Sequence, residues 1–232
     1  MNFHRIRQWI MKLLRGWGFS ILAAVLIATS FKSAIAEWND VPSGSMKPTI
    51  LVGDRVFVNK LSYGLKIPYT TWYIARWGSP QRGDIVVFYS PLDGKRLIKR
   101  LIGLPGDEIA LFNNRLYING KALHYEMMED VSPNPPGTKR VDPHATLSEN
   151  LLGKQHPIMI SGVKTPFNSF DPVVVPVGSA FVMGDNRDNS ADSRVFGFID
   201  INRIIGRATT IVLSRDGSFL NPRWERFFKK LI

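Results

Sequence analysis

The chain has 232 residues, of which 44% are hydrophobic and 21% charged, and it contains no cysteine. This composition excludes a disordered polymer, a collagen-like repeat and a disulfide-bonded scaffold. The absence of cysteine also excludes cysteine-ligated zinc sites and thiolate nucleophiles.

The formal net charge of +11 is concentrated at the two ends of the chain. Residues 1–36 carry five basic residues and no acidic one, and residues 215–232 carry five basic residues against two acidic ones. The segment 37–214 holds 20 basic and 17 acidic residues, a net charge of only +3. Basic ends beside apolar and aromatic residues favour contact with an anionic membrane surface over a nucleic-acid groove. We therefore expect membrane lipid as a partner and no nucleic acid.

The N-terminal segment has the length and polarity of one bilayer crossing. Residues 16–31 contain no charged side chain, and apolar residues continue upstream of them. We expect residues 1–36 to form a basic cytoplasmic N-terminus and a single transmembrane helix, which places the rest of the chain on the outer side. The same pattern, followed by Ala34 and Ala36, also describes a cleavable secretory signal. From this segment alone, both interpretations remain open.

Short β-branched runs separated by turn residues follow one another through residues 37–214. This spacing predicts a mainly β fold, with an antiparallel β domain. Asn113 and Asn114 stand between two of the runs and predict a hairpin turn, because Asn tolerates positive φ. The expected strands are 54–60, 84–90, 96–102, 108–112, 115–120, 179–185 and 207–213.

Two segments depart from this rhythm. Residues at about 122–178 are rich in proline and contain three of the four histidines, so we expect an inserted subdomain there. Residues 215–232 form a basic aromatic tail. We expect its last part to be a short helix, lying either at the membrane interface or on the domain surface.

Several common reaction centres are absent from the sequence. It contains no HExxH pair, no GxxxxGK[ST] phosphate loop and no GxGxxG run. A histidine-based triad is weakly supported, because one histidine precedes the apolar N-terminal segment and the others lie in the proline-rich insert. Three polar, glycine-bearing clusters remain, at 42–49, 96–107 and 184–194.

A lysine is the base that these clusters offer to a serine. The first cluster presents a serine on a glycine-containing loop, and lysine can activate it only when burial lowers the pKa of the amine. Lys99 meets this requirement best, because on a strand it shares a face with Leu97 and Leu101. Lys47 lies in a loop that looks exposed. For Lys99 the alternative is a solubility charge on an edge strand.

The acidic cluster also has two interpretations. Asp185, Asp188 and Asp192 alternate with amide and hydroxyl residues, as in a cation-binding loop. Arg187 and Arg194 lie within the same run, however, and the EF-hand spacing is absent. We therefore expect a rigid salt-bridged loop that carries one useful hydroxyl, and no metal.

At these clusters the chain resembles the type I signal peptidases, the bacterial leader peptidases with a serine-lysine dyad. The resemblance covers the N-terminal apolar segment and five runs in the order of the family, whereas the insert and the tail carry no match on which we rely. The five runs are PSGSMKPTI, GDRVFVNKLSYGL, RGDIVVF, IKRLIGLPGD and GDNRDNSADSR.

The resemblance implies that Ser45 is the nucleophile and Lys99 its general base. It also implies that Ser190 orients the Lys99 amine, and that the Ser43 hydroxyl and the Ser45 backbone N–H form an oxyanion hole. Leu97 departs from the family, which often has an aromatic residue at this position.

Two further features are implied by the resemblance. One is a supporting ion pair between Asp192 and Arg194. The other is a shallow apolar substrate pocket, whose matching positions here are Val41, Val87 and Ile98.

The implied function is that of a membrane-bound serine endopeptidase that removes N-terminal signal peptides from exported preproteins. It needs no metal or organic cofactor, and we expect a monomer in the bacterial cytoplasmic membrane with its catalytic domain on the outer side. Only 14 residues separate Phe31 from Ser45, at most roughly 46 Å of chain. This short reach places Ser45 near the membrane in which the apolar segment of a substrate is embedded. It therefore favours an uncleaved anchor, which keeps enzyme and substrate together. The alternatives are a self-cleaving serine-lysine protease of the repressor type and a non-catalytic, membrane-tethered binding protein.

Overall fold

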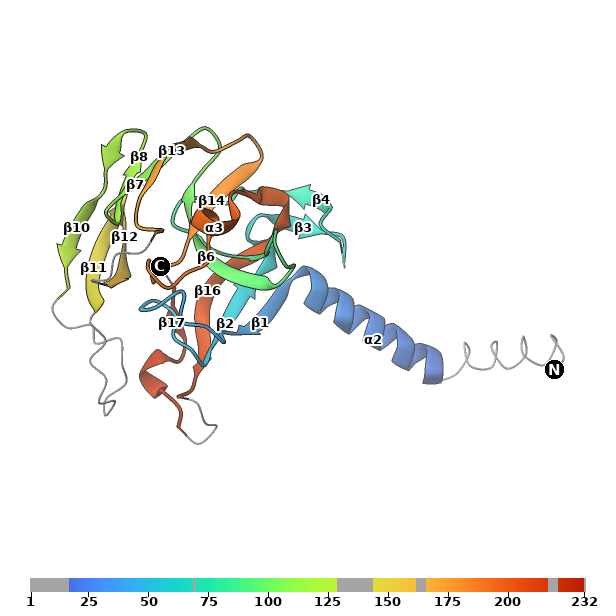
Figure 1. The fold of residues 1–232 in the computed structure, drawn as a ribbon. Coiled ribbons are helices and arrows are strands. Elements are labelled where there is room, and N and C mark those ends of the chain that lie inside the picture. The colour runs from blue at the N-terminus through green and yellow to red at the C-terminus, as the bar shows by residue number, and fades with distance from the viewer. Residues whose placement is uncertain (1–16, 69, 129–143, 162–165, 217–220, 232) are drawn as a thin grey trace.

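A computed structural model describes residues 17–68, 70–128, 144–161, 166–216 and 221–231. Within these ranges the chain is mainly antiparallel β-structure, as the sequence predicts, and its strands form four sheets (Figure 1). Each of the seven expected strands corresponds to an observed one.

The largest sheet has eight strands in the order β1-β2-β16-β5-β6-β14-β15, with β17 paired to β16. Neighbours pair antiparallel throughout. In β2 side chains alternate between buried and half-buried, so that Val56 and Val58 face the core. The strands are β1 (Ala36–Asp40), β2 (Asp54–Asn59), β5 (Ile85–Tyr89), β6 (Arg96–Gly103), β14 (Ser179–Met183), β15 (Ile199–Asp200), β16 (Ile204–Ser214) and β17 (Lys229–Lys230).

Three smaller sheets complete the strand structure. Asn113 and Asn114, with φ of 50° and 61°, form the predicted hairpin turn between the strands β7 (Glu108–Phe112) and β8 (Arg115–Ile118). The four-stranded sheet runs β13 (Phe170–Val174), β7 (Glu108–Phe112), β8 (Arg115–Ile118) and β9 (Lys121–Ala122); the three-stranded sheet runs β10 (His124–Met127), β11 (His144–Leu151) and β12 (Lys154–Ser161); and β3 (Gly64–Lys66) pairs with β4 (Tyr73–Arg76).

The expected insert at about 122–178 contributes to two of these sheets. Strands β10, β11 and β12 form a sheet of their own, whereas β13 pairs with β7. An isolated parallel bridge between Met159 of β12 and Asn186 connects the three-stranded sheet to the acidic cluster. Residues 129–143 and 162–165 of the insert lie outside the described residues.

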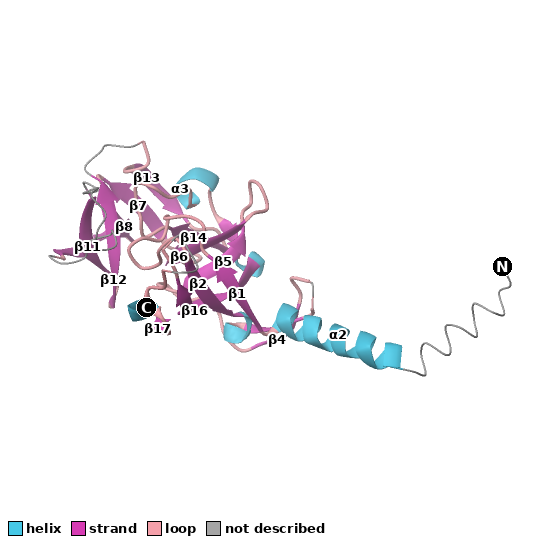
Figure 2. Ribbon diagram, turned by 90° about the horizontal axis from the view of Figure 1, so that it is seen from below, coloured by secondary structure: helices cyan, strands magenta, loops and turns pink. Residues whose placement is uncertain are grey.

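Helical structure is sparse in the described part of the chain. The α-helices are α2 (Trp17–Ala34) and α3 (Ser193–Phe196), and the 3-10 helices are η1 (Lys60–Ser62), η2 (Ile201–Arg203) and η3 (Trp224–Arg226). Helix α2 projects away from the body of strands in both views (Figures 1 and 2). Its side chains are mostly exposed, including Trp17, Ile21 and Leu26.

The predicted membrane crossing falls mainly on α2. Among the described residues, no helix combines the length and the apolar character that a bilayer crossing requires. Residues 1–16 lie outside the described residues. The transmembrane helix therefore stays a prediction.

The expectation of a helical C-terminal tail is wrong for its described part. Only one 3-10 turn, η3, forms, and β17 then pairs with Thr210 and Ile211 of β16. The extended pairing is favoured because it buries Leu231 beside the core and satisfies its N–H, which donates to the Thr209 carbonyl at 2.9 Å.

Candidate active site

Ser45 lies on the loop between β1 and β2. The two ends of this loop are held together, because the Val41 N–H donates to the Asp54 carbonyl at 2.9 Å and the Gly53 N–H to the Val41 carbonyl at 3.0 Å. Met46 and Ile50 are fully buried and pack in the hydrophobic core below the loop. Met46 and Ile50 lie at the two ends of the turn that follows Ser45. Their burial anchors this turn, and with it the serine, to the core.

Lys99 of β6 reaches this loop from the neighbouring part of the sheet. Its Nζ lies 2.6 Å from Ser45 Oγ, and the lysine is 2% exposed. Burial lowers the pKa of the Lys99 amine to about 8, although the Asp192 and Asp185 carboxylates act in the opposite direction. The edge-strand alternative is wrong, because β6 is an interior strand between β5 and β14. The structure therefore brings together the serine and the lysine that the resemblance selects.

The acidic cluster forms a loop, residues 184–194, that is held by ion pairs as expected. Arg194 binds both carboxylate oxygens of Asp192 at 2.8 Å, so the implied pair is present. The Asp192 carboxylate also accepts the Gly184 N–H at 2.9 Å and caps α3 through the Arg194 N–H at 3.2 Å. Burial alone would raise the pKa of Asp192, but its bonds to Arg194 outweigh burial and lower the pKa.

Ser190 on this loop is close to Ser45. A Cβ atom placed on Gly184 would meet both the Ser190 hydroxyl and the Ser45 carbonyl oxygen at less than 3.0 Å. The Ser190 hydroxyl is buried, and it lies close enough to the Asp192 carboxylate to help lower the pKa of that group. The Lys99 amine donates to Ser45 in this arrangement, and the role that the resemblance implies for Ser190, orienting that amine, stays a prediction.

The other implied residues lie on both sides of Ser45. Ser43 is exposed on the same loop. Val41 and Val87 are buried and belong to one hydrophobic cluster, against which the half-buried Ile98 packs. Val87 of β5 and Ile98 of β6 are also direct cross-strand partners.

Arg100 and Asp185 form an ion pair that no pattern in the sequence predicted. The Arg100 guanidinium donates two hydrogen bonds of 2.8 Å to the Asp185 carboxylate, and both side chains are buried. Asp185 also accepts the hydroxyl of Thr49, four residues after Ser45. Burial alone would raise the pKa of Asp185, whereas Arg100 lowers it. Strand alternation indicated that Arg100 points away from Lys99, but it did not indicate the partner.

Asn186 is a second contact that the sequence analysis missed. Its backbone N–H donates to the Ser45 carbonyl at 3.1 Å, and its side-chain amide donates to the Gly44 carbonyl at 3.1 Å. Asn186 is 3% exposed. It therefore holds the peptide carbonyls on both sides of the Ser45 Cα, although no feature of the sequence connects it with Ser45.

The carboxylates of the acidic loop are all engaged by protein groups. Asp185 binds Arg100, Asp192 binds Arg194, and Asp188 accepts the Ser161 N–H at 2.6 Å. Within the described residues, no three histidine or acidic side chains are grouped as a metal ion would require. The chemistry that this site offers is that of a buried amine next to a hydroxyl.

Comparison with known proteins identifies the family. The family described as "Signal peptidase, peptidase S26" matches residues 14–213. Signal peptidase I of Pseudomonas fluorescens is 35% identical over 214 residues, which cover 87% of this chain and 73% of that protein. Signal peptidase I of Pseudomonas aeruginosa is 34% identical over 215 residues, with the same coverage.

Two further relatives were found. A probable signal peptidase I-2 of Synechocystis is 32% identical over 198 residues, covering 82% of this chain and 69% of that protein. A crystal structure of a signal peptidase I from Enterococcus faecalis shares 33% identity and covers 56% of this chain and 97% of its own, with a TM-score of 0.35 that adds nothing to the assignment. By the family match and the two Pseudomonas relatives, the chain belongs to the signal peptidase family, peptidase S26, and is a signal peptidase.

Proposed function

We propose that this signal peptidase cleaves with Ser45 as nucleophile and Lys99 as general base. The observation that carries the proposal is the 2.6 Å separation of Lys99 Nζ and Ser45 Oγ, with the amine buried. A buried amine with a pKa of about 8 is partly neutral near neutral pH, and only the neutral amine accepts a proton. The pair thus has both the geometry and the protonation state of an activated serine.

The proposed reaction has two steps. Neutral Lys99 accepts the Ser45 proton while the serine oxygen attacks the scissile carbonyl carbon, and the resulting ammonium then protonates the leaving amine as the peptide C–N bond breaks. In the second step water attacks the acyl-enzyme ester and gives a proton to Lys99. The lysine passes this proton to the Ser45 oxygen as the ester C–O bond breaks, which releases the new carboxyl end and restores the neutral amine. Both steps use groups of the chain and water alone.

Two hydroxyls support this reaction in our proposal. Ser190 orients the Lys99 amine during proton transfer, which is supported by its buried hydroxyl beside Ser45. The Ser43 hydroxyl and the Ser45 N–H stabilise the negative charge that develops on the carbonyl oxygen. The Asp192–Arg194 pair holds the loop that carries Ser190.

We propose that the substrate lies extended beside the cluster formed by Val41, Val87 and Ile98. Val41 and Val87 are buried and Ile98 is half-buried, so the three present only a small apolar surface to a substrate side chain, and we infer that the pocket is small. Limited volume favours small residues at the first and third positions before the cut. An extended substrate can add to a strand edge through main-chain hydrogen bonds.

We propose that the enzyme acts at the bacterial cytoplasmic membrane on signal peptides that are themselves embedded there. The five basic residues of 1–36 and the uncharged run 16–31 support an anchored N-terminus with the catalytic domain on the outer side. Recovery of the full chain in the membrane fraction after an alkaline carbonate wash is the expected result. Recovery in the wash would contradict this part of the proposal alone.

The dyad is tested by cleavage of a synthetic signal-peptide substrate in detergent. Ser45→Ala and Lys99→Ala should each lower kcat by at least a thousandfold, because each removes a group that takes part in bond making or proton transfer. Lys47→Ala is the matched control. Lys47 lies on the loop that carries Ser45 but has no proposed role, so this variant should retain kcat. A serine-acylating inhibitor should modify the wild type at Ser45.

The alternatives make different predictions. Normal turnover by Ser45→Ala or by Lys99→Ala would overturn the dyad. A repressor-type protease would cleave its own chain rather than a separate signal peptide, and a silent binding protein would neither cleave nor react with the inhibitor.

A further inference from the structure

The β11–β12 hairpin of the expected insert is attached directly to the loop 184–194. The Met159 N–H of β12 donates to the Asp185 carbonyl at 2.8 Å, and the Met159 carbonyl accepts the Arg187 N–H at 2.9 Å. At the end of the same strand, the Ser161 N–H and hydroxyl donate to the Asp188 carboxylate at 2.6 and 3.0 Å. The hairpin thus holds the loop at two successive places.

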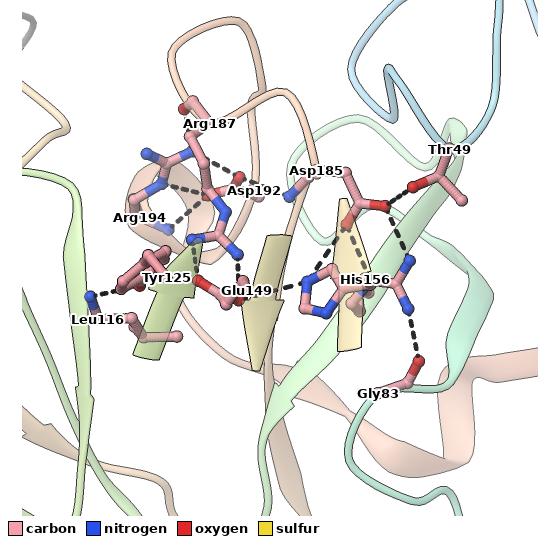
Figure 3. Close-up of polar contacts among 12 residues, drawn as sticks. Thr49, Gly83, Leu116, Tyr125, Glu149, His156, Asp185, Arg187, Asp192 and Arg194 are labelled. Atoms are coloured by element: carbon pink, nitrogen blue, oxygen red, sulfur yellow. Dashed lines mark hydrogen bonds and ion pairs between the residues drawn. The ribbon is translucent and has the colours of Figure 1, made fainter. Parts of the chain in front are cut away.

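A buried ion pair makes the third attachment. The Arg187 guanidinium donates to Glu149 of β11 at 2.6 and 2.8 Å, and the two side chains are 1% and 0% exposed (Figure 3). His156, the cross-strand partner of Glu149, lies with Nε2 3.3 Å from Glu149 and 4.0 Å from Asp185. Burial alone would raise the pKa of Glu149, but Arg187 and His156 outweigh it and hold the pKa far below its ordinary value.

Arg187 depends on Glu149 for its charge balance. Its Nε is buried and has no hydrogen-bond partner within the described ranges, while its other two nitrogens bind Glu149. Removing the carboxylate would leave the buried guanidinium without the counter-charge that it binds, because the nearby Asp185 is already paired with Arg100. We expect either the Arg187 side chain or its backbone to move in response.

Movement of Arg187 would reach the proposed catalytic groups from two directions. The residue before it, Asn186, holds the Ser45 and Gly44 carbonyls. The Arg187 carbonyl itself accepts a 2.6 Å hydrogen bond from Arg194, which binds Asp192. The position of Arg187 is therefore linked to the nucleophile on one side and to the support of Ser190 on the other.

We propose that Glu149 is a positioning residue of the active site, which acts through Arg187 to fix the loop that holds the Ser45 backbone and carries Ser190. The proposal rests on the proposed function and gives the β11–β12 hairpin a role in it. Glu149 contacts no reacting group, so it affects how the site is held and not how the substrate binds.

The test compares Glu149→Gln with a matched control in the signal-peptide assay, using the full chain in detergent. Glu149→Gln keeps the side-chain size and removes the charge, and we expect kcat to fall at least tenfold while KM stays within twofold. The control is Asp107→Asn, which removes a carboxylate that is 8% exposed and bound by Arg82 at 2.8 Å. The control should lower Tm and retain kcat per folded molecule.

A double variant separates positioning from folding. Glu149→Gln/Arg187→Gln removes both charges of the pair, so we expect it to fold more readily than the single variant. Its kcat should equal that of Arg187→Gln, because Glu149 acts only through Arg187. If the single variant does not fold, wild-type kcat in the folded double variant overturns the proposal and a tenfold loss supports it. If neither folds, Glu149→Asp takes their place, because it keeps the charge but shortens the side chain. A tenfold loss of kcat in this variant supports the proposal, and wild-type kcat overturns it.

The results also separate this inference from the proposed function. An inactive wild type, or an active Ser45→Ala, would overturn the dyad. A normal wild type and an inactive Ser45→Ala, together with wild-type kcat in folded Glu149→Gln, would overturn only the positioning role. Losses in the two single variants that multiply in the double variant would also overturn it, since they would show that Glu149 and Arg187 act independently.

Discussion

Gly184 lies against the Ser45 carbonyl so closely that a Cβ atom on Gly184 would come within 3.0 Å of that oxygen. The same atom would also collide with the Ser190 hydroxyl. The contact explains why a residue without a side chain stands at the start of the loop 184–194: the backbone of this loop and that of the nucleophile loop pass at a distance that admits no methyl group.

Gly184→Ala should therefore abolish most of the activity. Either the Ser45 backbone or Ser190 must shift to admit the methyl group, and we expect kcat to fall at least a hundredfold in the signal-peptide assay. Gly94→Ala is the control. Its Cβ meets nothing within 4 Å, but its φ of 68° strains alanine, so it should lower Tm and retain kcat. Wild-type kcat in Gly184→Ala would show that the contact is not important for catalysis.

The pH dependence of cleavage should report the Lys99 amine. Only its neutral form accepts the Ser45 proton, and burial lowers its pKa to about 8. Below this pH, kcat/KM should fall about tenfold per pH unit, and it should level off above it. The measurement is kcat/KM across a range of about pH 6 to 10, with the ionic strength held constant. An acid limb near 10.5, the ordinary pKa of lysine, would contradict the burial of the amine.

Lys99→Met should stabilise the folded protein at neutral pH although it inactivates the enzyme. The pKa of Lys99 is about 8 when folded and 10.5 ordinarily, so between these values the unfolded chain binds more protons. The lysine therefore lowers the free energy of unfolding as the pH falls from about 10.5 to about 8, by on the order of 3 kcal/mol in total. Urea unfolding of Ser45→Ala with and without Lys99→Met should show this gain at pH 7 and a smaller one at pH 10. An equal gain at both values would assign it to packing alone.

The C-terminal tail should contribute to stability through Arg226. Its guanidinium binds the fully buried Asp54 at 2.6 and 3.2 Å and donates to the Thr49 carbonyl at 3.1 Å. Arg226→Met leaves the Asp54 charge poorly compensated, and we expect a loss of about 3 kcal/mol in the free energy of unfolding.

A surface pair provides the comparison for Arg226. Arg55 binds Asp40 at 2.7 Å, but the two side chains are 36% and 65% exposed, so Arg55→Met should cost less than about 1 kcal/mol. Both values come from urea unfolding curves with matched m-values. Equal losses in the two variants would mean that the burial of Asp54 does not decide the contribution of its partner.

Local patterns were sufficient for much of the fold. Residues 84–90 and 96–102 alternate or cluster apolar side chains as β5 and β6 require, and Asn113-Asn114 takes the left-handed conformation that its position between strands predicted. The C-terminal tail was predicted wrongly as helix. Its aromatic and basic spacing is compatible with a short helix, and only the part of β16 beyond its pairing with β5 decides that Lys229 and Lys230 add a strand instead.

The amino-acid sequence narrows the residue types available for catalysis, since a chain without cysteine, whose histidines lie outside the best-marked strands, leaves serine and lysine. The resemblance carried by the motif runs then selects Ser45 and Lys99. The approach of Lys99 Nζ to Ser45 Oγ at 2.6 Å follows only from the folded arrangement, as do the contacts of Asn186 with the Gly44 carbonyl, of Arg100 with Asp185 and of Glu149 with Arg187. The physical reason is that burial and ion pairing are properties of segments distant along the chain, and the pKa of an amine follows from what surrounds it, not from its neighbours in sequence.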